Sequence, residues 1–151
     1  MINIQNPEDI LNKLEHLNPD AKPVWGKMSP QHIVEHLALA LQISTGKSPQ
    51  ILYLPEEEAA RVKGKIIHTE GELPMGIKTP ILGDEPPPLV YPDLSSAINH
   101  LQDELKYWNE YSAKNPQAIH MHPRMGPLNQ KEWTILHGKH FTHHLKQFGL
   151  V

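Results

Sequence analysis

The chain has 151 residues, a formal net charge of −3 without a basic stripe, and no cysteine. Disulfide bonds are therefore excluded, any thiol must arrive with a substrate, and nucleic acid or an anionic membrane surface is not an expected partner. The length predicts a single domain over residues 1–151, and the absence of an apolar run near 20 residues predicts a soluble, cytoplasmic protein.

Two helices are predicted in the first 45 residues. Asn6 and Pro7 form a cap followed by a first-turn proline, and apolar residues at helical spacing then predict a helix over residues 7–17. Ser29 and Pro30 repeat this signal, which predicts a second helix over residues 30–44. His36 shares the apolar face of the second helix, so we expect its imidazole to point inward.

A proline-rich segment follows over residues 46–92. Its eight prolines and five glycines prevent any long helix, and only residues 56–62 are predicted to form a short one. Connections of this length inside a domain are uncommon and usually functional. We therefore expect the segment to form a lid or wall of a site.

Two longer helices are predicted in the last third of the chain. Asp93 caps a helix over residues 94–113, and Asn115 followed by a proline ends it. Asn129 with Glu132 forms a capping-box signal for a final helix that runs to about Phe148. The sequence thus predicts four main helices interrupted by one long irregular stretch.

The final helix carries two histidines four residues apart. This spacing places His140 and His144 on one helical face, which they share with Trp133 and Leu136, so both imidazoles are expected to point inward. If the second and last helices are antiparallel neighbours, His36 lies at the same level, about 10 Å from one end of both helices. Three neutral imidazoles at one level predict a metal site with an open coordination position.

Other histidines offer weaker alternatives. A helical pair at this spacing also arises by chance or as a satisfied core pair, and a site built on His32 and His36 is an alternative. His137 and His143 flank the inward face and are expected to support a ligand or to lie at the surface. A further pair, His120 and His122, precedes the last helix at its opposite end, about 18 Å or more of helix from His140, and is not expected to reach the same ion.

Several motifs together resemble the DinB/YfiT-like superfamily, and within it a branch catalogued only as a domain of unknown function. The resemblance spans nearly the whole chain. It implies an all-α fold, a four-helix bundle of up-down-down-up topology with the long proline-rich crossover between helices two and three. It also implies a metal triad of one histidine from the second helix and a pair from the fourth: His36, His140 and His144. The motifs that carry it are Trp25 to Gln31, His36-Leu37, His122-Pro123, Gly126-Pro127-Leu128, Glu132-Trp133, His140, His143-His144 and Gln147-Phe148.

The resemblance also suggests a chemistry. Three neutral imidazoles leave the full charge on a divalent ion, for which zinc and nickel are the expected metals. Characterised relatives include transferases and isomerases that use bacillithiol or mycothiol, which implies a metal-dependent transferase using a low-molecular-weight thiol on a small electrophile. The alternatives are a metal-dependent hydrolase and a non-catalytic metal-binding or ligand-binding stress protein. No catalytic residue is assigned, and a homodimer is a further expectation.

Overall fold

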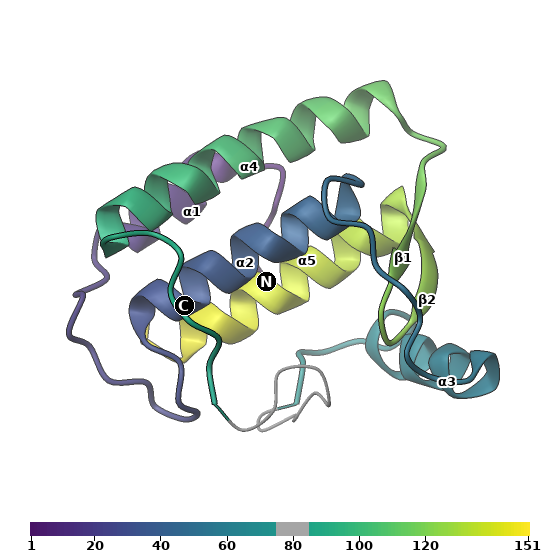
Figure 1. The fold of residues 1–151 in the computed structure, drawn as a ribbon, viewed down its shortest axis with the longest axis horizontal. Helices are drawn as coiled ribbons and strands as arrows, with labels where there is room; N and C mark the ends of the chain where they lie inside the picture. The colour runs from purple at the N-terminus through teal and green to yellow at the C-terminus, as the bar shows by residue number, and fades with distance from the viewer. Residues whose placement is uncertain (75–84) are drawn as a thin grey trace.

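The computed structural model describes residues 1–74 and 85–151, so positions 75–84 of the proline-rich segment lie outside the described residues. Figure 1 shows how the described helices and strands are arranged. No described helix is long and apolar enough to cross a membrane. The elements are, in chain order, α1 (Pro7–Leu14), α2 (Pro30–Ser44), α3 (Glu56–Ile66), α4 (Leu94–Lys114), β1 (Ile119–His122), β2 (Gly126–Asn129) and α5 (Gln130–Lys146).

The prediction of an all-α, four-helix bundle with up-down-down-up topology is wrong. The described residues contain five helices and a two-stranded antiparallel sheet, in which Ile119 pairs with Asn129 and His122 with Gly126. Gly126 has φ of 80°, a conformation that favours glycine and lets the chain reverse before β2. Each strand has only four residues, too short for an alternating apolar pattern to be recognised in the sequence.

The predicted helix starts are confirmed by their caps. At the start of α2, Ser29 Oγ accepts a hydrogen bond from the backbone N–H of His32 (3.2 Å), and His32 Nδ1 accepts one from Ser29 N–H (3.2 Å). Asn129 and Glu132 form the reciprocal pair predicted for α5. These pairs satisfy backbone donors that a helix start leaves free. The predicted ends were less accurate: α1 ends three residues before position 17, and α3 continues four residues beyond position 62.

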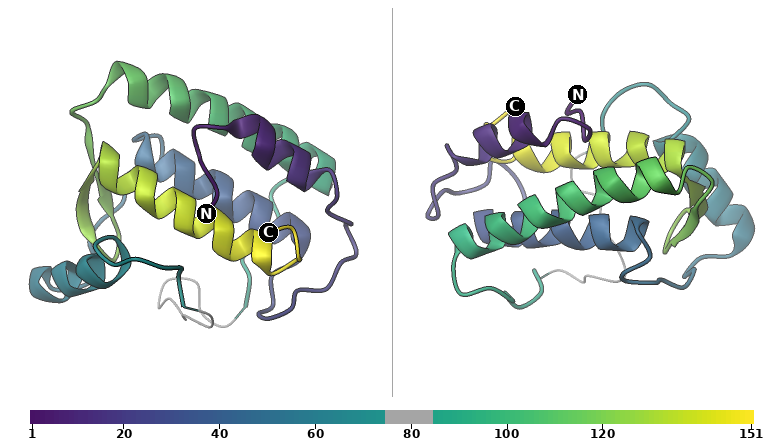
Figure 2. Two further views of the ribbon diagram at one scale, coloured as in Figure 1. Left: turned by 180° about the vertical axis from the view of Figure 1, so that it is seen from behind. Right: turned by 90° about the horizontal axis from the view of Figure 1, so that it is seen from above.

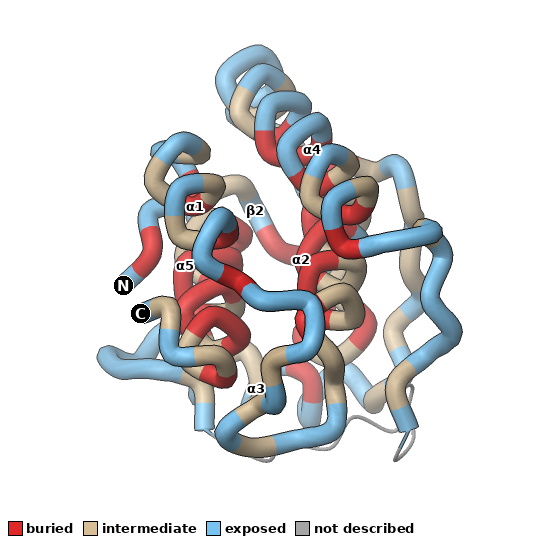
Figure 3. Tube along the Cα trace, turned by 90° about the vertical axis from the view of Figure 1, so that its left-hand side faces the viewer, coloured by how far each residue is buried: buried red, intermediate tan, exposed pale blue. Residues whose placement is uncertain are grey.

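Four helices, α1, α2, α4 and α5, share the main apolar core. The buried residues lie on the sides of α2, α4 and α5 that face one another, as Figure 3 shows. In Figures 1 and 2, α2 and α5 lie side by side, and α2 ends near the hairpin from which α5 begins. These two helices are therefore antiparallel neighbours, the arrangement on which the level of His36 depends. The largest core side chains include Ile10, Ile33, Leu37, Leu101, Leu105, Trp108 and Phe141.

A second apolar cluster joins α3 and the hairpin to α5. Its buried members are Ile67, Met125, Leu128, Trp133 and Leu136. Polar contacts hold α3 in the same place, because Lys139 of α5, which is only 6% exposed, donates from Nζ to the carbonyl oxygens of Ile66 (2.6 Å) and Thr69 (2.7 Å). A salt bridge of 2.8 Å joins Lys63 to Glu132. The short helix of the crossover is thus fixed against the last helix.

Glu35 on α2 holds the other end of the crossover. Its carboxylate accepts hydrogen bonds from the backbone N–H groups of Val90 (2.7 Å) and Tyr91 (3.2 Å) and from the side chain of Gln31 (2.8 Å). Partial burial would raise the pKa of Glu35, but these hydrogen bonds outweigh it and hold the pKa below its ordinary value. Both described ends of the crossover are therefore tied to helices that carry the predicted metal ligands.

Candidate metal centre

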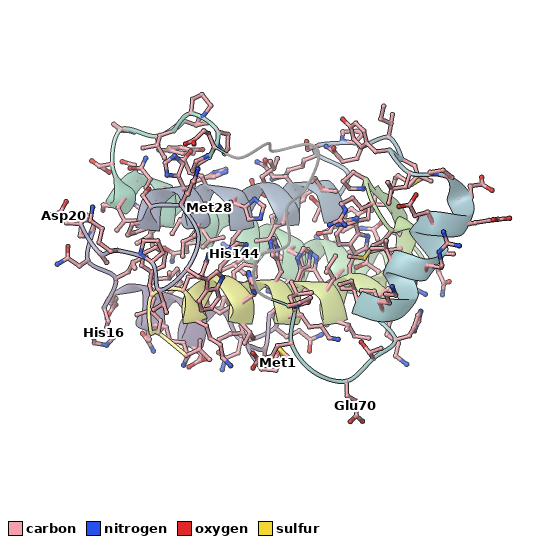
Figure 4. The ribbon with its side chains drawn as sticks, turned by 90° about the horizontal axis from the view of Figure 1, so that it is seen from below. Met1, His16, Asp20, Met28, Glu70 and His144 are labelled. Carbon is pink, nitrogen blue, oxygen red and sulfur yellow. The ribbon has the colours of Figure 1, made fainter. Side chains whose placement is uncertain are left out.

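Three histidines from two helices converge between α2 and α5. Nε2 of His36 lies 2.8 Å from Nε2 of His140, which lies 3.1 Å from Nε2 of His144. One ligand atom from each of the three falls within 4.8 Å of the others, and no second group of three or more potential ligands of this kind occurs in the described part of the chain. Figure 4 shows His144 in the space between the two helices. The structure thus brings together the three residues predicted from spacing and level.

Burial keeps these imidazoles neutral. It lowers the pKa of His36 to about 4 and that of His144 to about 3, and it holds the pKa of His140 well below its ordinary value. The neighbouring imidazoles act in the same direction, because each disfavours a positive charge on the next. A neutral imidazole is the form that donates a lone pair to a metal ion, so the site is ready for one at pH 7.

Gln147 sets the tautomer of His144. The Gln147 amide nitrogen donates to the carbonyl oxygen of Trp25 (3.2 Å), so the amide oxygen faces Nδ1 of His144 at 2.6 Å. A carbonyl oxygen only accepts, and Nδ1 must therefore carry the proton. Nε2 of His144 is left with its lone pair directed at His140, which is the orientation that outer hydrogen bonds commonly impose on metal-binding histidines.

The contacts of His140 are better satisfied by a cation than by hydrogen bonds. A neutral imidazole nitrogen holds either one proton or one lone pair, so Nε2 of His140 can form a good hydrogen bond with only one of its two neighbours. A divalent ion can accept a lone pair from all three nitrogens. Nitrogen ligands at ~2.0–2.1 Å from a tetrahedral zinc lie about 3.3 Å apart, close to the separations of 2.8 and 3.1 Å found here. The donor set therefore fits such an ion.

The three histidines line a half-open cavity of about 670 Å³, a volume suited to a small molecule. Its walls come from α2, α5, α3, the hairpin and the loop before α2. Because α3 belongs to the crossover, the described part of the crossover forms one wall, as expected. Most of the lining is apolar. The lining includes Trp25, Lys27, Val62, Ile66, Glu85, His122, Arg124, Trp133, Leu136 and His143.

The flanking histidines take other positions. His32 caps α2 and is absent from the cluster, so the alternative site on His32 and His36 is not assembled. His143 is half-buried, lines the cavity, and has its ring 5.0 Å from that of His144. His137 is fully buried, with Nε2 2.8 Å from Ser44 Oγ. Because Ser44 gives its own proton to the carbonyl oxygen of Leu41, His137 donates in this contact.

Sequence reasoning missed the contribution of the hairpin to the cavity. His122 lies near the far end of α5 from the triad, as predicted, yet it lines the same cavity, with its ring 5.7 Å from Trp133. Burial lowers the pKa of His122 to about 4. His120 instead bonds Tyr111 (2.6 Å) on α4. No element was predicted for the run from His122 to Gly126, and only the pairing of the two strands places Arg124 at the cavity.

The fold and the site define a mainly helical protein with a three-histidine candidate metal centre at the wall of a small-molecule-sized cavity. The chain belongs to the family described as "Protein of unknown function (DUF1569)", whose model matches residues 1–149. No curated protein and no solved structure matches it. The prediction of a family of unknown function is thus confirmed, whereas membership of the DinB/YfiT-like superfamily stays a prediction.

Replacing Gln147 by leucine should weaken zinc binding by about 10- to 100-fold, the usual effect of removing a hydrogen-bond partner of a metal-binding histidine. Without the amide oxygen, Nδ1 of His144 has no acceptor and the ring is free to adopt the other tautomer. Competition with a chromophoric zinc chelator measures the change. Gln50→Leu is the matched control, because Gln50 lines the same cavity but among the described residues bonds only Ser48. Equal affinities of wild type and Gln147→Leu would contradict the prediction.

Proposed function

We propose that His36, His140 and His144 bind a divalent transition metal, zinc or nickel, and that the protein is a metal-dependent enzyme acting on a small molecule. The observation that carries the proposal is the convergence of three neutral imidazole nitrogens at the wall of the cavity. Three protein ligands are typical of catalytic zinc sites, which keep a coordination position open, whereas structural sites use four.

We infer that the reaction is the transfer of a low-molecular-weight thiol to a small electrophile. When bound, the ion supplies a positive charge that favours the deprotonated, nucleophilic form of a thiol. The described cavity lining contains one acidic side chain, Glu85, which is exposed and paired with Lys27 at 3.0 Å. A thiol activated by charge needs no carboxylate base, so this lining suits thiol chemistry. The histidines would hold the ion, and the apolar walls would enclose the electrophile.

The same site admits two other functions. A metal-dependent hydrolase would commonly use a carboxylate base beside the ion, and the described lining supports this less well. A non-catalytic metal-binding or ligand-binding stress protein would use the triad and the cavity without turnover. The thiol reaction further suits the cytoplasm, where small thiols are kept reduced. The homodimer stays a prediction.

An assay on the zinc-loaded, untagged protein separates these functions. Glutathione, bacillithiol and mycothiol are each combined with 1-chloro-2,4-dinitrobenzene, and thioether formation is followed by absorbance above the uncatalysed rate. We expect turnover with at least one thiol in the wild type and none in His36→Ala. Hydrolysis of 4-nitrophenyl acetate without thiol turnover would favour the hydrolase, and zinc binding with neither reaction would favour the binding protein. Failure to bind any stoichiometric transition metal would overturn all three.

A further inference from the structure

We propose that the cavity binds an organic carboxylate, with the carboxylate held by Arg124 and the opposite end of the molecule at the three-histidine site. The proposal rests on the metal centre proposed above and adds the chemical class of the ligand. The features that carry it are an unpaired guanidinium, the charge of the cavity lining and the separation of the two sites along α5.

Arg124 lines the cavity, and none of the described residues pairs with its charge. Its Nε atom is buried and has no hydrogen-bond partner, and no carboxylate in the described part of the chain pairs with its guanidinium. Arg124 as a whole is only partly buried, but a buried polar atom without a hydrogen-bond partner is costly. A guanidinium offers a planar fork of donors that matches the two oxygens of a carboxylate. A carboxylate ligand would therefore satisfy a group that the fold leaves unsatisfied.

The charges of the lining favour an anion. The described lining contains two cationic side chains and one acidic side chain, and the acidic one, Glu85, already bonds Lys27. The histidines of the triad are neutral, so they do not reduce the charge of a divalent ion. Arg124 and the ion would together make the cavity positive, and low-dielectric walls strengthen the attraction of a positive cavity for an anion.

Arg124 and the triad adjoin different turns of α5. The backbone N–H of Arg124 donates to Nδ1 of His122 (3.1 Å), and the His122 ring lies against Trp133. Trp133 precedes His140 by seven residues of α5, or about 10 Å of helix. Apolar side chains line the cavity on α5 and α3, among them Leu136, Val62 and Ile66. The Arg124 backbone thus adjoins a position of α5 about two turns from the triad, with apolar lining on the helix between them.

Two probes of matched shape test this assignment. The protein is loaded with cobalt(II), whose visible spectrum reports coordination, and is titrated with 6-mercaptohexanoate and with its neutral analogue 6-mercaptohexanamide. The thiol of either probe coordinates the ion and gives a sulfur-to-cobalt absorption band, and only the first carries the carboxylate. We expect the acid to bind about 10-fold or more tightly than the amide, because hydrogen bonds to a charged group are the strong ones.

Variants at two arginines separate this proposal from the proposed function. Arg124→Gln should abolish the preference for the acid while leaving cobalt binding unchanged, and Arg124→Lys should keep part of it. Arg61→Gln, which changes an exposed arginine on α3, should keep all of it. Equal affinities for the two probes, binding of neither probe, or a full preference in Arg124→Gln would overturn the carboxylate site with the metal centre intact. If the wild type bound no cobalt, both the metal centre and the carboxylate site would be overturned.

Discussion

Replacing His140 by alanine is expected to abolish stoichiometric zinc binding. His140 is the central member of the triad, because its Nε2 lies 2.8 Å from that of His36 and 3.1 Å from that of His144. Its loss leaves two ligands, so we expect the affinity to fall by more than the ~10–100-fold caused by losing an outer hydrogen-bond partner. Untagged protein is stripped with chelator, reconstituted with zinc, desalted and measured by elemental analysis.

His143→Ala is the matched control for this experiment. His143 lies on the same helix and lines the same cavity, but its side chain is outside the cluster of ligand atoms. We expect it to retain one equivalent of zinc. Circular dichroism of both metal-free variants establishes that each is folded. One equivalent of zinc retained by His140→Ala, or an equal loss in His143→Ala, would contradict the assignment of the triad.

Acid should destabilise the metal-free protein through its buried neutral histidines. Burial lowers the pKa of His137 to about 3 and that of His122 to about 4. Both are neutral in the folded protein at pH 5, whereas in the unfolded chain each takes up a proton below about pH 6.5. Their contribution to stability is therefore fully present above pH 6.5 and falls as the pH decreases. Between pH 6.5 and 5 each should cost about 2 kcal/mol of unfolding free energy.

Urea unfolding in the presence of chelator, at pH 7 and at pH 5, measures this loss. His137→Gln removes the titrating group, so the difference in unfolding free energy between the two pH values should shrink by about 2 kcal/mol. The comparison uses the difference between pH values, and any general destabilisation by the substitution cancels. His16→Gln, at an exposed position on the N-terminal side of the core, should leave the difference unchanged. An unchanged pH dependence in His137→Gln would refute the argument.

The last helix connects stability to the site. On α5, Glu132 and Lys139 hold α3, and His140 and His144 offer the ligand nitrogens. Gln147, directly after the helix, bonds the loop that contains Trp25. A shift of this helix would move the ligands and two cavity walls together. We therefore expect substitutions that disturb the position of α5 to affect metal affinity and ligand binding at the same time.

Helix positions and the triad were largely predictable, because their signals are local. The bounds of α2 agree with the prediction from Ser29, Pro30 and the apolar repeat, since caps and a 3.6-residue period act within one or two turns. The facing of His140 and His144 followed from their spacing of four. The level of His36 followed from helix lengths once an antiparallel pair was assumed.

The hairpin and the cavity were not predictable in this way. The two strands within residues 119–129 form because they pair with each other and pack against α2 and α5. A strand of four residues has too little local preference for its sequence to predict it. The error in fold class follows directly. So does the omission of Arg124 and His122 from the predicted site, because both reach the cavity only when the hairpin lies beside the start of α5.

By itself, the sequence determined where most helices begin, which faces they bury, and that His140 and His144 share one helical face. The tertiary structure alone decided that these histidines meet His36 within 4.8 Å, that they adjoin a cavity, and that the crossover forms its wall. The physical reason is the range of the interactions. Caps and periodicity act between near neighbours, whereas the bonds that shape the cavity join residues 73 positions apart, as in Lys139 to Ile66, and 122 positions apart, as in Gln147 to Trp25.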